Sequence, residues 1–176
     1  MLTAQGVRLL NRRNSEIEVP IGGYLPLLEF VMGTWGSGPF DSDTAEDFLD
    51  EMEERSAPRR LEVVEHTFRT AIEAGGNSTL SVLPEEVVAA AAVVAANVPT
   101  GRSLPWNEEY PSVTEWLAKP VAPLLASSAI QALELTVPTG GWFWRSWVDA
   151  DEREEAQAAI NSLRAVLLHV SEGGSR

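Results

Sequence analysis

The sequence contains no cysteine, a single lysine (Lys119), two histidines and no long hydrophobic run. Without cysteine, the protein can form neither disulfide bonds nor thiolate metal and redox sites. Because no stretch approaches about 18 consecutive apolar residues, a transmembrane helix is not expected. The first twenty residues also lack the apolar core of a secretory signal peptide, so by elimination we expect a cytoplasmic protein.

Basic residues are scarce relative to acidic ones. The 176 residues include 13 Lys and Arg against 26 Asp and Glu, which gives a formal net charge of −13. Nucleic-acid binding requires a basic face, so we expect no nucleic-acid partner. Anionic membrane surfaces would repel such a chain as well, so we expect no membrane partner. The length and the 44% hydrophobic content are those of one ordinary globular domain.

Residues 1–31 differ from the rest of the chain in charge. They contain three Arg and three Glu, so the whole net charge of −13 lies after them. Their apolar stretch, IGGYLPLLEFV, is interrupted by glycine, proline and glutamate. We expect a loose leader or a start-site artefact, because chain termini are seldom ordered unless they are tied down. In the alternative, residues 21–31 pack as an extra strand or helix.

The remainder has the pattern of a single all-α domain of five or six helices over residues 32–170, followed by a disordered tail at 171–176. The clearest helices are expected at 43–56, 58–74 and 150–170. Apolar residues of the first recur at i, i+3, i+4 and i+7, which is one face of a helix. Asp43 followed by Glu46 is typical of a capping box at its start.

The alanine-rich segment VVAAAAVVAA (87–96) is apolar all round, which predicts a helix buried on every side. Its alanines favour a helix over a strand. We expect a loop over residues 97–111, a short helix at about 112–119, and then a helix with Pro120 and Pro123 in its first turn.

Four aromatic residues gather at positions 142–147, in the sequence WFWRSW. Such a cluster usually anchors a helix to the core, because each ring buries a large area. Trp106 and Trp116 lie in or next to the expected loop, so they are the better candidates for exposed aromatic contacts.

No local pattern indicates catalysis or a cofactor. The sequence GTWGSG (33–38) is not a phosphate-binding loop, which requires a lysine that is absent here. Asp41, Asp43 and Asp47 resemble the start of a calcium loop, but Glu46 and Met52 occupy positions that need Gly and Glu. The two histidines, His66 and His169, lie far apart and lack zinc-site spacing. We therefore expect no metal, no cofactor and no catalytic residues, and an enzyme is the less expected function.

The run DSDTAEDFLDEMEER (41–55) is the strongest charged feature, with eight acids and one arginine. One interpretation is a solvated helix face. The other is a docking surface for a basic protein, because complementary charge steers encounter and sets specificity. The candidate binding residues are Asp47, Asp50, Glu51, Glu53 and Glu54.

Residues 32–52, MGTWGSGPFDSDTAEDFLDEM, resemble the opening of a bacterial family known as domain of unknown function 4259. The matching positions are Gly33, Trp35, Gly36, Gly38, Phe40, Asp43, Ala45 and Asp47. The resemblance extends over about residues 32–168 and implies no activity. Members usually begin at the Met-Gly pair, which favours the start-site artefact. We expect the motif, with Asp41 included, to be structural.

Two functions follow from these features. The first is a protein-binding module that docks a basic partner, of which an immunity or antitoxin protein is one form. The second is a small-molecule-binding protein or enzyme that uses the Gly/Trp/Asp turn at 33–43. A concave pocket that holds Trp35, Asp41 or His66 beside other polar groups would favour the second function, and a flat acidic face the first. The sequence leaves the oligomeric state open.

Overall fold

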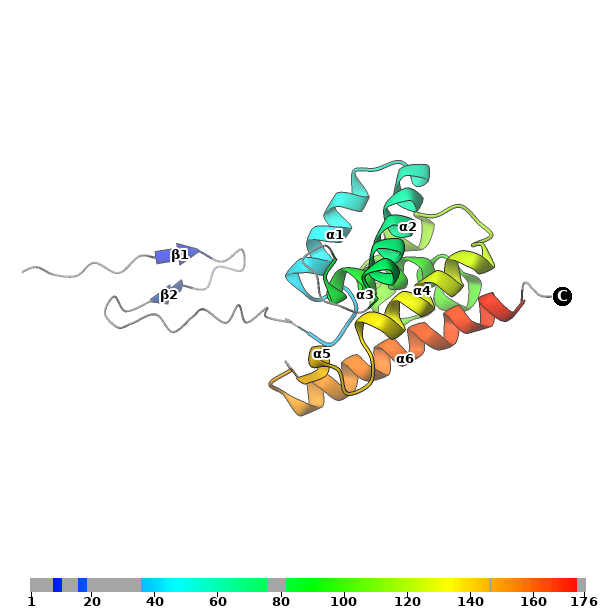
Figure 1. Ribbon diagram of the computed structural model, residues 1–176. Coiled ribbons are helices and arrows are strands. Elements are labelled where there is room, and N and C mark those ends of the chain that lie inside the picture. Colours follow the sequence, from blue (N-terminus) through cyan, green and yellow to red (C-terminus); the bar gives the residue numbers. More distant parts are fainter. Residues whose placement is uncertain (1–7, 11–15, 19–35, 76–81, 146, 174–176) are drawn as a thin grey trace, which may run out of the picture. The chain divides into compact units, whose positions relative to one another are not determined.

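The computed structural model describes residues 8–10, 16–18, 36–75, 82–145 and 147–173 (Figure 1). The chain divides into two units, residues 1–31 and residues 32–176. In the first unit, β1 (Arg8–Leu10) pairs with β2 (Glu16–Glu18) in an antiparallel ribbon, with Leu9 opposite Ile17. The alternative in which residues 21–31 pack as an extra element falls outside the described residues.

The described part of the second unit is helical, which confirms the predicted all-α class. Its α-helices are α1 (Asp43–Glu53), α2 (Ala57–Ala74), α3 (Pro84–Ala96), α4 (Pro123–Thr136), α5 (Trp142–Arg145) and α6 (Ala150–Gly173). Three short 3-10 helices, η1 (Pro99–Gly101), η2 (Pro105–Glu108) and η3 (Pro111–Glu115), occupy the connection between α3 and α4. Among the described residues, no helix is both long and apolar enough to cross a membrane.

Several predicted boundaries are wrong. The short helix expected at about 112–119 is reduced to the 3-10 helix η3, and α1 ends at Glu53 rather than at residue 56. Pro120 precedes α4 instead of lying in its first turn, which begins at Pro123. Helix α6 continues to Gly173, so residues 171–173 are helical rather than part of a disordered tail. Residues 174–176 lie outside the described part of the chain.

Helix α3 is the centre of the domain, as its apolar sequence predicts. Every residue from Val87 to Ala96 is buried. The helix contacts α1, α2, α4 and α6, which surround it (Figure 1). The run of alanines permits this arrangement, because small side chains let neighbouring helices approach closely. The prediction of a helix buried on every side is therefore confirmed.

The buried side chain of Asn97 joins the end of α3 to the 3-10 segment. Its Nδ2 donates to the carbonyl oxygens of Val93 and Val113, both at 2.8 Å, and its Oδ1 accepts from the backbone N–H of Leu117 at 3.1 Å. A buried amide with all these partners costs little to desolvate, whereas an unpaired one would be destabilising. Asn97 therefore fixes the path of the chain after α3.

Helix α1 is held by its cap and by its apolar face. Ser42, rather than Asp43, is the N-cap residue, and its Oγ accepts from the backbone N–H of Ala45 at 3.1 Å. The capping box predicted from Asp43 and Glu46 is therefore wrong, because Ser42 takes the cap position and the residue three further on, Ala45, has no side chain that could complete a box. The buried face consists of Ala45, Phe48, Leu49 and Met52.

Arg60 of α2 ties the end of α1 to the rest of the domain. Its guanidinium donates to the carbonyl oxygen of Met52 at 2.8 Å and to that of Glu53 at 3.0 Å. Carbonyl groups in the last turn of a helix have no partner within the helix, and an arginine can satisfy them. The same guanidinium lies 5.0 Å from the ring centroid of Trp116, which is a cation–π distance.

The tryptophans are distributed differently from the prediction. Trp116 is only 5% exposed, so the expectation that it is an exposed contact is wrong. Trp116 belongs to the hydrophobic core, and the Arg60 guanidinium lies over its ring. In the aromatic cluster, Phe143 and Trp144 are buried and form an edge-to-face pair with centroids 4.9 Å apart. Trp142 is exposed, so only part of the cluster anchors the core.

We predict that Phe40→Ala destabilises the domain by about 3–5 kcal/mol, the usual cost of emptying a large buried aromatic site. Phe40 is fully buried and meets Tyr110 edge-to-face at 5.2 Å. Urea unfolding of the full chain measures the change. Val148→Ala is the control, because Val148 is 96% exposed and its truncation should change stability by less than about 0.5 kcal/mol. Equal stability of the two variants would contradict the structural role of Phe40.

Candidate functional site

The glycine-rich turn before α1 folds around the side chain of Asp41. The backbone N–H of Gly38 donates a hydrogen bond to Asp41 Oδ2 at 2.7 Å. A Cβ atom on Gly36 would lie 2.3 Å from Asp41 Oδ2, and one on Gly38 would lie 2.8 Å from both carboxylate oxygens. Gly36 also has a φ of +147°, a conformation that favours glycine. Both glycines therefore let the backbone approach this carboxylate closely.

The other described residues of the motif also have structural positions. Phe40 is in the core, and Asp43 is exposed at the first residue of α1, where an acid suits the helix dipole. Gly33 and Trp35 fall outside the described residues, so their structural role stays a prediction. The polar groups of the turn therefore bond within the turn and to α6, where Glu155 Oε2 accepts from Ser37 Oγ at 2.8 Å.

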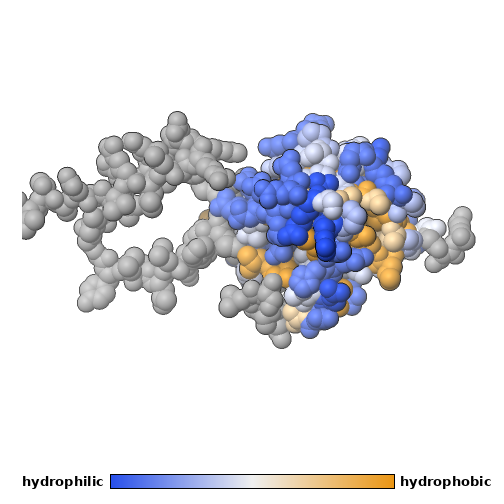
Figure 2. Space-filling model, turned by 90° about the horizontal axis from the view of Figure 1, so that it is seen from above, coloured by the Kyte–Doolittle hydropathy of each residue, from blue (hydrophilic) through white to orange (hydrophobic). Residues whose placement is uncertain are grey.

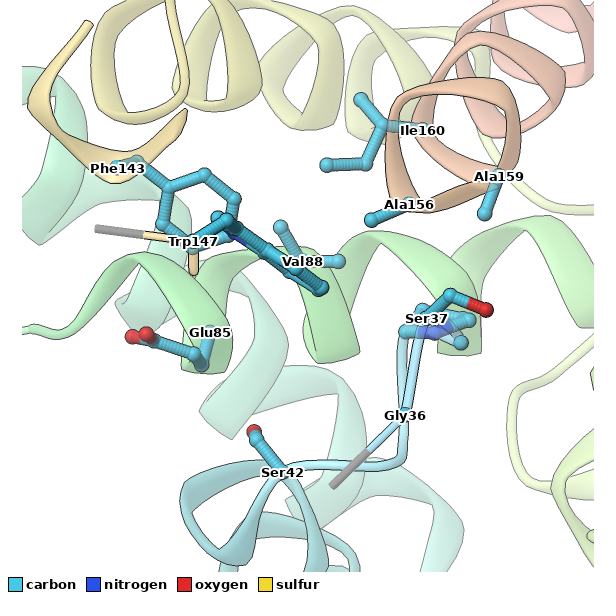
Figure 3. Close-up of a pocket in the computed structure, with 12 residues that line it drawn as sticks. Gly36, Ser37, Ser42, Glu85, Val88, Phe143, Trp147, Ala156, Ala159 and Ile160 are labelled. Atoms are coloured by element: carbon cyan, nitrogen blue, oxygen red, sulfur yellow. The ribbon is translucent and has the colours of Figure 1, made fainter. Parts of the chain in front are cut away.

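A small cavity lies beside this turn (Figure 3). The turn forms one wall. The other walls come from α3, from α6, and from α5 together with the nearby Trp147. Lining residues outside the turn are Ser42, Glu85, Val88, Phe143, Trp147, Ala156, Ala159 and Ile160. The cavity volume is about 30 Å³, which is about the space of one water molecule.

Glu85 supplies the titratable group of the cavity. Its Oε2 is buried and has no hydrogen-bond partner among the described residues. Burial raises the pKa of Glu85, and a hydrogen bond from its own backbone N–H lowers it by a smaller amount. No sequence pattern indicates this burial, because an acid in the first turn of a helix is ordinary. Glu85 lines the cavity together with Ser42 and Trp147, which come from distant segments, so the burial of its carboxyl group depends on tertiary packing (Figure 3).

The five predicted binding residues are brought together on one exposed surface. Asp47, Asp50, Glu51 and Glu53 lie on α1, and Glu54 is its C-cap residue. All are exposed, on the side of the helix opposite its buried face. Figure 2 looks onto the side of the domain where α1 and α2 lie in Figure 1, and this surface is largely hydrophilic. We call these five residues the acidic face.

Little of the charge on the acidic face is neutralised within the protein. Glu51 forms an ion pair with Arg55, one turn further along the chain. Between described residues, the other four acids take part in no ion pair. Like charges this close repel one another, which destabilises the isolated helix. The acidic face therefore carries negative charge that a basic ligand could compensate.

A larger concave region adjoins the acidic face. This groove has a volume of about 460 Å³ and lies between α1, α2 and the start of α3. Its charged and polar lining residues are Glu51, Arg55, Arg59, Glu62, His66, Thr67 and Glu86. Within the described part of the chain, no group of three or more His, Cys, Asp or Glu residues could hold a metal ion. The groove was not foreseen, because it combines residues from three helices.

Together these features define an all-α domain with an exposed acidic helix that follows a glycine-rich structural turn. The chain belongs to the family described as "Domain of unknown function (DUF4259)", whose family model matches residues 33–159. The match includes the turn, the helices α1 to α5 and the first part of α6. The resemblance identified in the sequence is therefore confirmed. Separate comparisons with curated proteins and with solved structures found no match.

We predict that Glu85→Gln raises the melting temperature at pH 7 and has a smaller effect near pH 4. The pKa of Glu85 is raised by burial in the folded chain. Ionisation of this group therefore opposes folding at pH 7, and this penalty disappears as the pH falls through the folded pKa. Thermal unfolding at the two pH values measures the difference. Glu134→Gln, on the exposed surface of α4, is the control. A loss of stability at pH 7 would contradict the prediction.

Proposed function

We propose that the protein binds a basic protein partner through the acidic face of α1. The observation that carries the proposal is the gathering of five exposed acids on one helix, four of them outside any ion pair between described residues. A solvated helix face does not require such local density of one charge. A basic surface would relieve the repulsion within the face and accelerate encounter.

The position of the helix in the fold supports this proposal. The buried face of α1 packs in the core, and Arg60 and Ser42 hold its two ends. The acidic face is therefore presented on a fixed element, and binding does not first have to order the helix. A pre-ordered surface loses less conformational entropy on association than a flexible one. In a finer form of the proposal, the partner is a toxin that this protein neutralises as an immunity or antitoxin protein.

The alternative, a small-molecule-binding protein or enzyme built on the turn at 33–43, receives less support. In the described part of the turn, the Asp41 carboxylate already accepts a hydrogen bond from the backbone N–H of Gly38. The adjacent cavity has a volume of only about 30 Å³. The groove that contains His66 is the feature that favours a small ligand, because its volume lies within the usual range of about 300–1,000 Å³. Its lining is strongly charged, whereas most small-molecule sites are largely apolar.

The test begins with capture of partners from a lysate of the source organism on the tagged full chain. Association rates of the purified partner are then measured with the wild type and with Asp50→Lys combined with Glu54→Lys. Both residues are exposed, so the fold should be retained. We predict association at least about tenfold slower, with the difference shrinking at high salt, because steering is electrostatic.

The control carries the same change of charge elsewhere. Glu134→Lys combined with Glu172→Lys reverses two exposed acids on α4 and α6. This variant should slow association much less than the variant of the acidic face. Equal rates for the two double variants would refute the proposed location of binding. A partner without a basic surface would refute the proposed chemistry.

A further inference from the structure

The groove beside the acidic face has an excess of negative charge that can be traced to one residue. Glu51 pairs with Arg55, and Arg59 Nη1 donates to Glu62 Oε2 at 2.6 Å, so two glutamates of the lining are neutralised by two arginines. Glu86 takes part in no ion pair between described residues. The lining therefore retains one negative charge, at Glu86, when His66 is neutral.

A backbone contact at the start of α3 holds the Glu86 side chain, but no ion pair between described residues neutralises its charge. It is the third residue of α3, half-buried, and its carboxyl interacts with the backbone N–H of Leu83, which caps the helix. Burial raises the pKa of Glu86, the neighbouring charge of Glu51 raises it further, and Leu83 N–H and His66 lower it. A cation placed beside Glu86 would favour its ionised form and offset the cost of its burial.

One hydroxyl group on the groove wall is available for a further contact. Within the described part of the chain the hydroxyl of Thr67 forms no hydrogen bond, and a hydroxyl oxygen can accept one from an N–H donor. Thr67 thus offers a second contact to a ligand that carries N–H groups.

We propose that this groove receives one lysine or arginine side chain of the basic partner, with Glu86 as its counter-charge and Thr67 as a hydrogen-bond acceptor. This inference rests on the proposed function. Glu51 belongs both to the acidic face and to the lining of the groove, so a partner docked on the face lies next to its opening. The volume of about 460 Å³ leaves room for a long side chain. The acidic face steers the partner, and the groove anchors it.

A defined probe tests the anchor without the natural partner. The probe is a peptide with blocked ends in which arginine and glycine alternate over nine residues. The matched peptide has citrulline, a neutral isostere, in place of arginine. Binding is measured by calorimetry at low salt with the full-length wild type, Glu86→Gln and Glu134→Gln. Glutamine at position 86 retains an oxygen that can accept from Leu83 N–H, so the cap of α3 should survive.

We expect Glu86→Gln to weaken binding of the arginine peptide about tenfold, the usual scale for loss of a charge-assisted contact, and Glu134→Gln to leave it almost unchanged. We also expect the pKa of Glu86, followed through its carboxyl carbon by NMR, to fall when the arginine peptide is added and to stay constant with the citrulline peptide. The second measurement reports on the groove itself rather than on the overall charge of the protein.

The outcomes separate this inference from the proposed function. If Asp50→Lys with Glu54→Lys weakens peptide binding but Glu86→Gln does not, the face binds and the groove is no anchor. If the wild type binds neither the peptide nor a basic partner, the proposed function itself fails. An unchanged pKa of Glu86 on binding would also overturn the anchor.

Discussion

Burial of α3 on all sides is the constraint on which the rest of the domain depends. A helix that is apolar around its whole circumference cannot face water on any side, so other helices must enclose it. In this protein α1, α2, α4 and α6 do so. The alanines of α3 allow close packing, but they supply little volume. The large side chains of the core therefore come from the surrounding elements, among them Phe40, Phe68, Met52, Leu133, Leu163 and Leu167.

This constraint also determines which surface α1 exposes. Its apolar residues must face the core, so its acids are placed on the opposite side. The turn around Asp41 and the cap by Ser42 fix where the helix begins, and Arg60 satisfies carbonyl groups at its end. The enclosure of α3 also brings Glu85 and Glu86 to two different depressions. Glu85 lines the small cavity and Glu86 the groove, because adjacent residues of a helix point in different directions.

Periodicity predicted the helical class, the buried α3 and the acidic face, because these depend on the order of residues within one element. The family motif could also be recognised in the sequence. The structure explains Gly36 and Gly38 of this motif by the close approach of their backbone to the carboxylate of Asp41. Features that depend on contacts between elements were missed or misjudged. The sequence suggested that Trp116 is exposed, because its neighbours form a loop, but it packs into the hydrophobic core with Arg60 of α2 over its ring. The buried carboxyl of Glu85 and the groove around Glu86 likewise require three or more elements to be packed.

Hydrogen–deuterium exchange of the full chain, alone and bound to the captured partner, tests whether a basic partner binds on α1. Exchange reports local opening of backbone hydrogen bonds, so it locates the bound surface without any substitution. We predict slower exchange in α1 and in the first half of α2, with little change in α4. Protection confined to the region of Trp142 and Val148, with α1 unchanged, would contradict it.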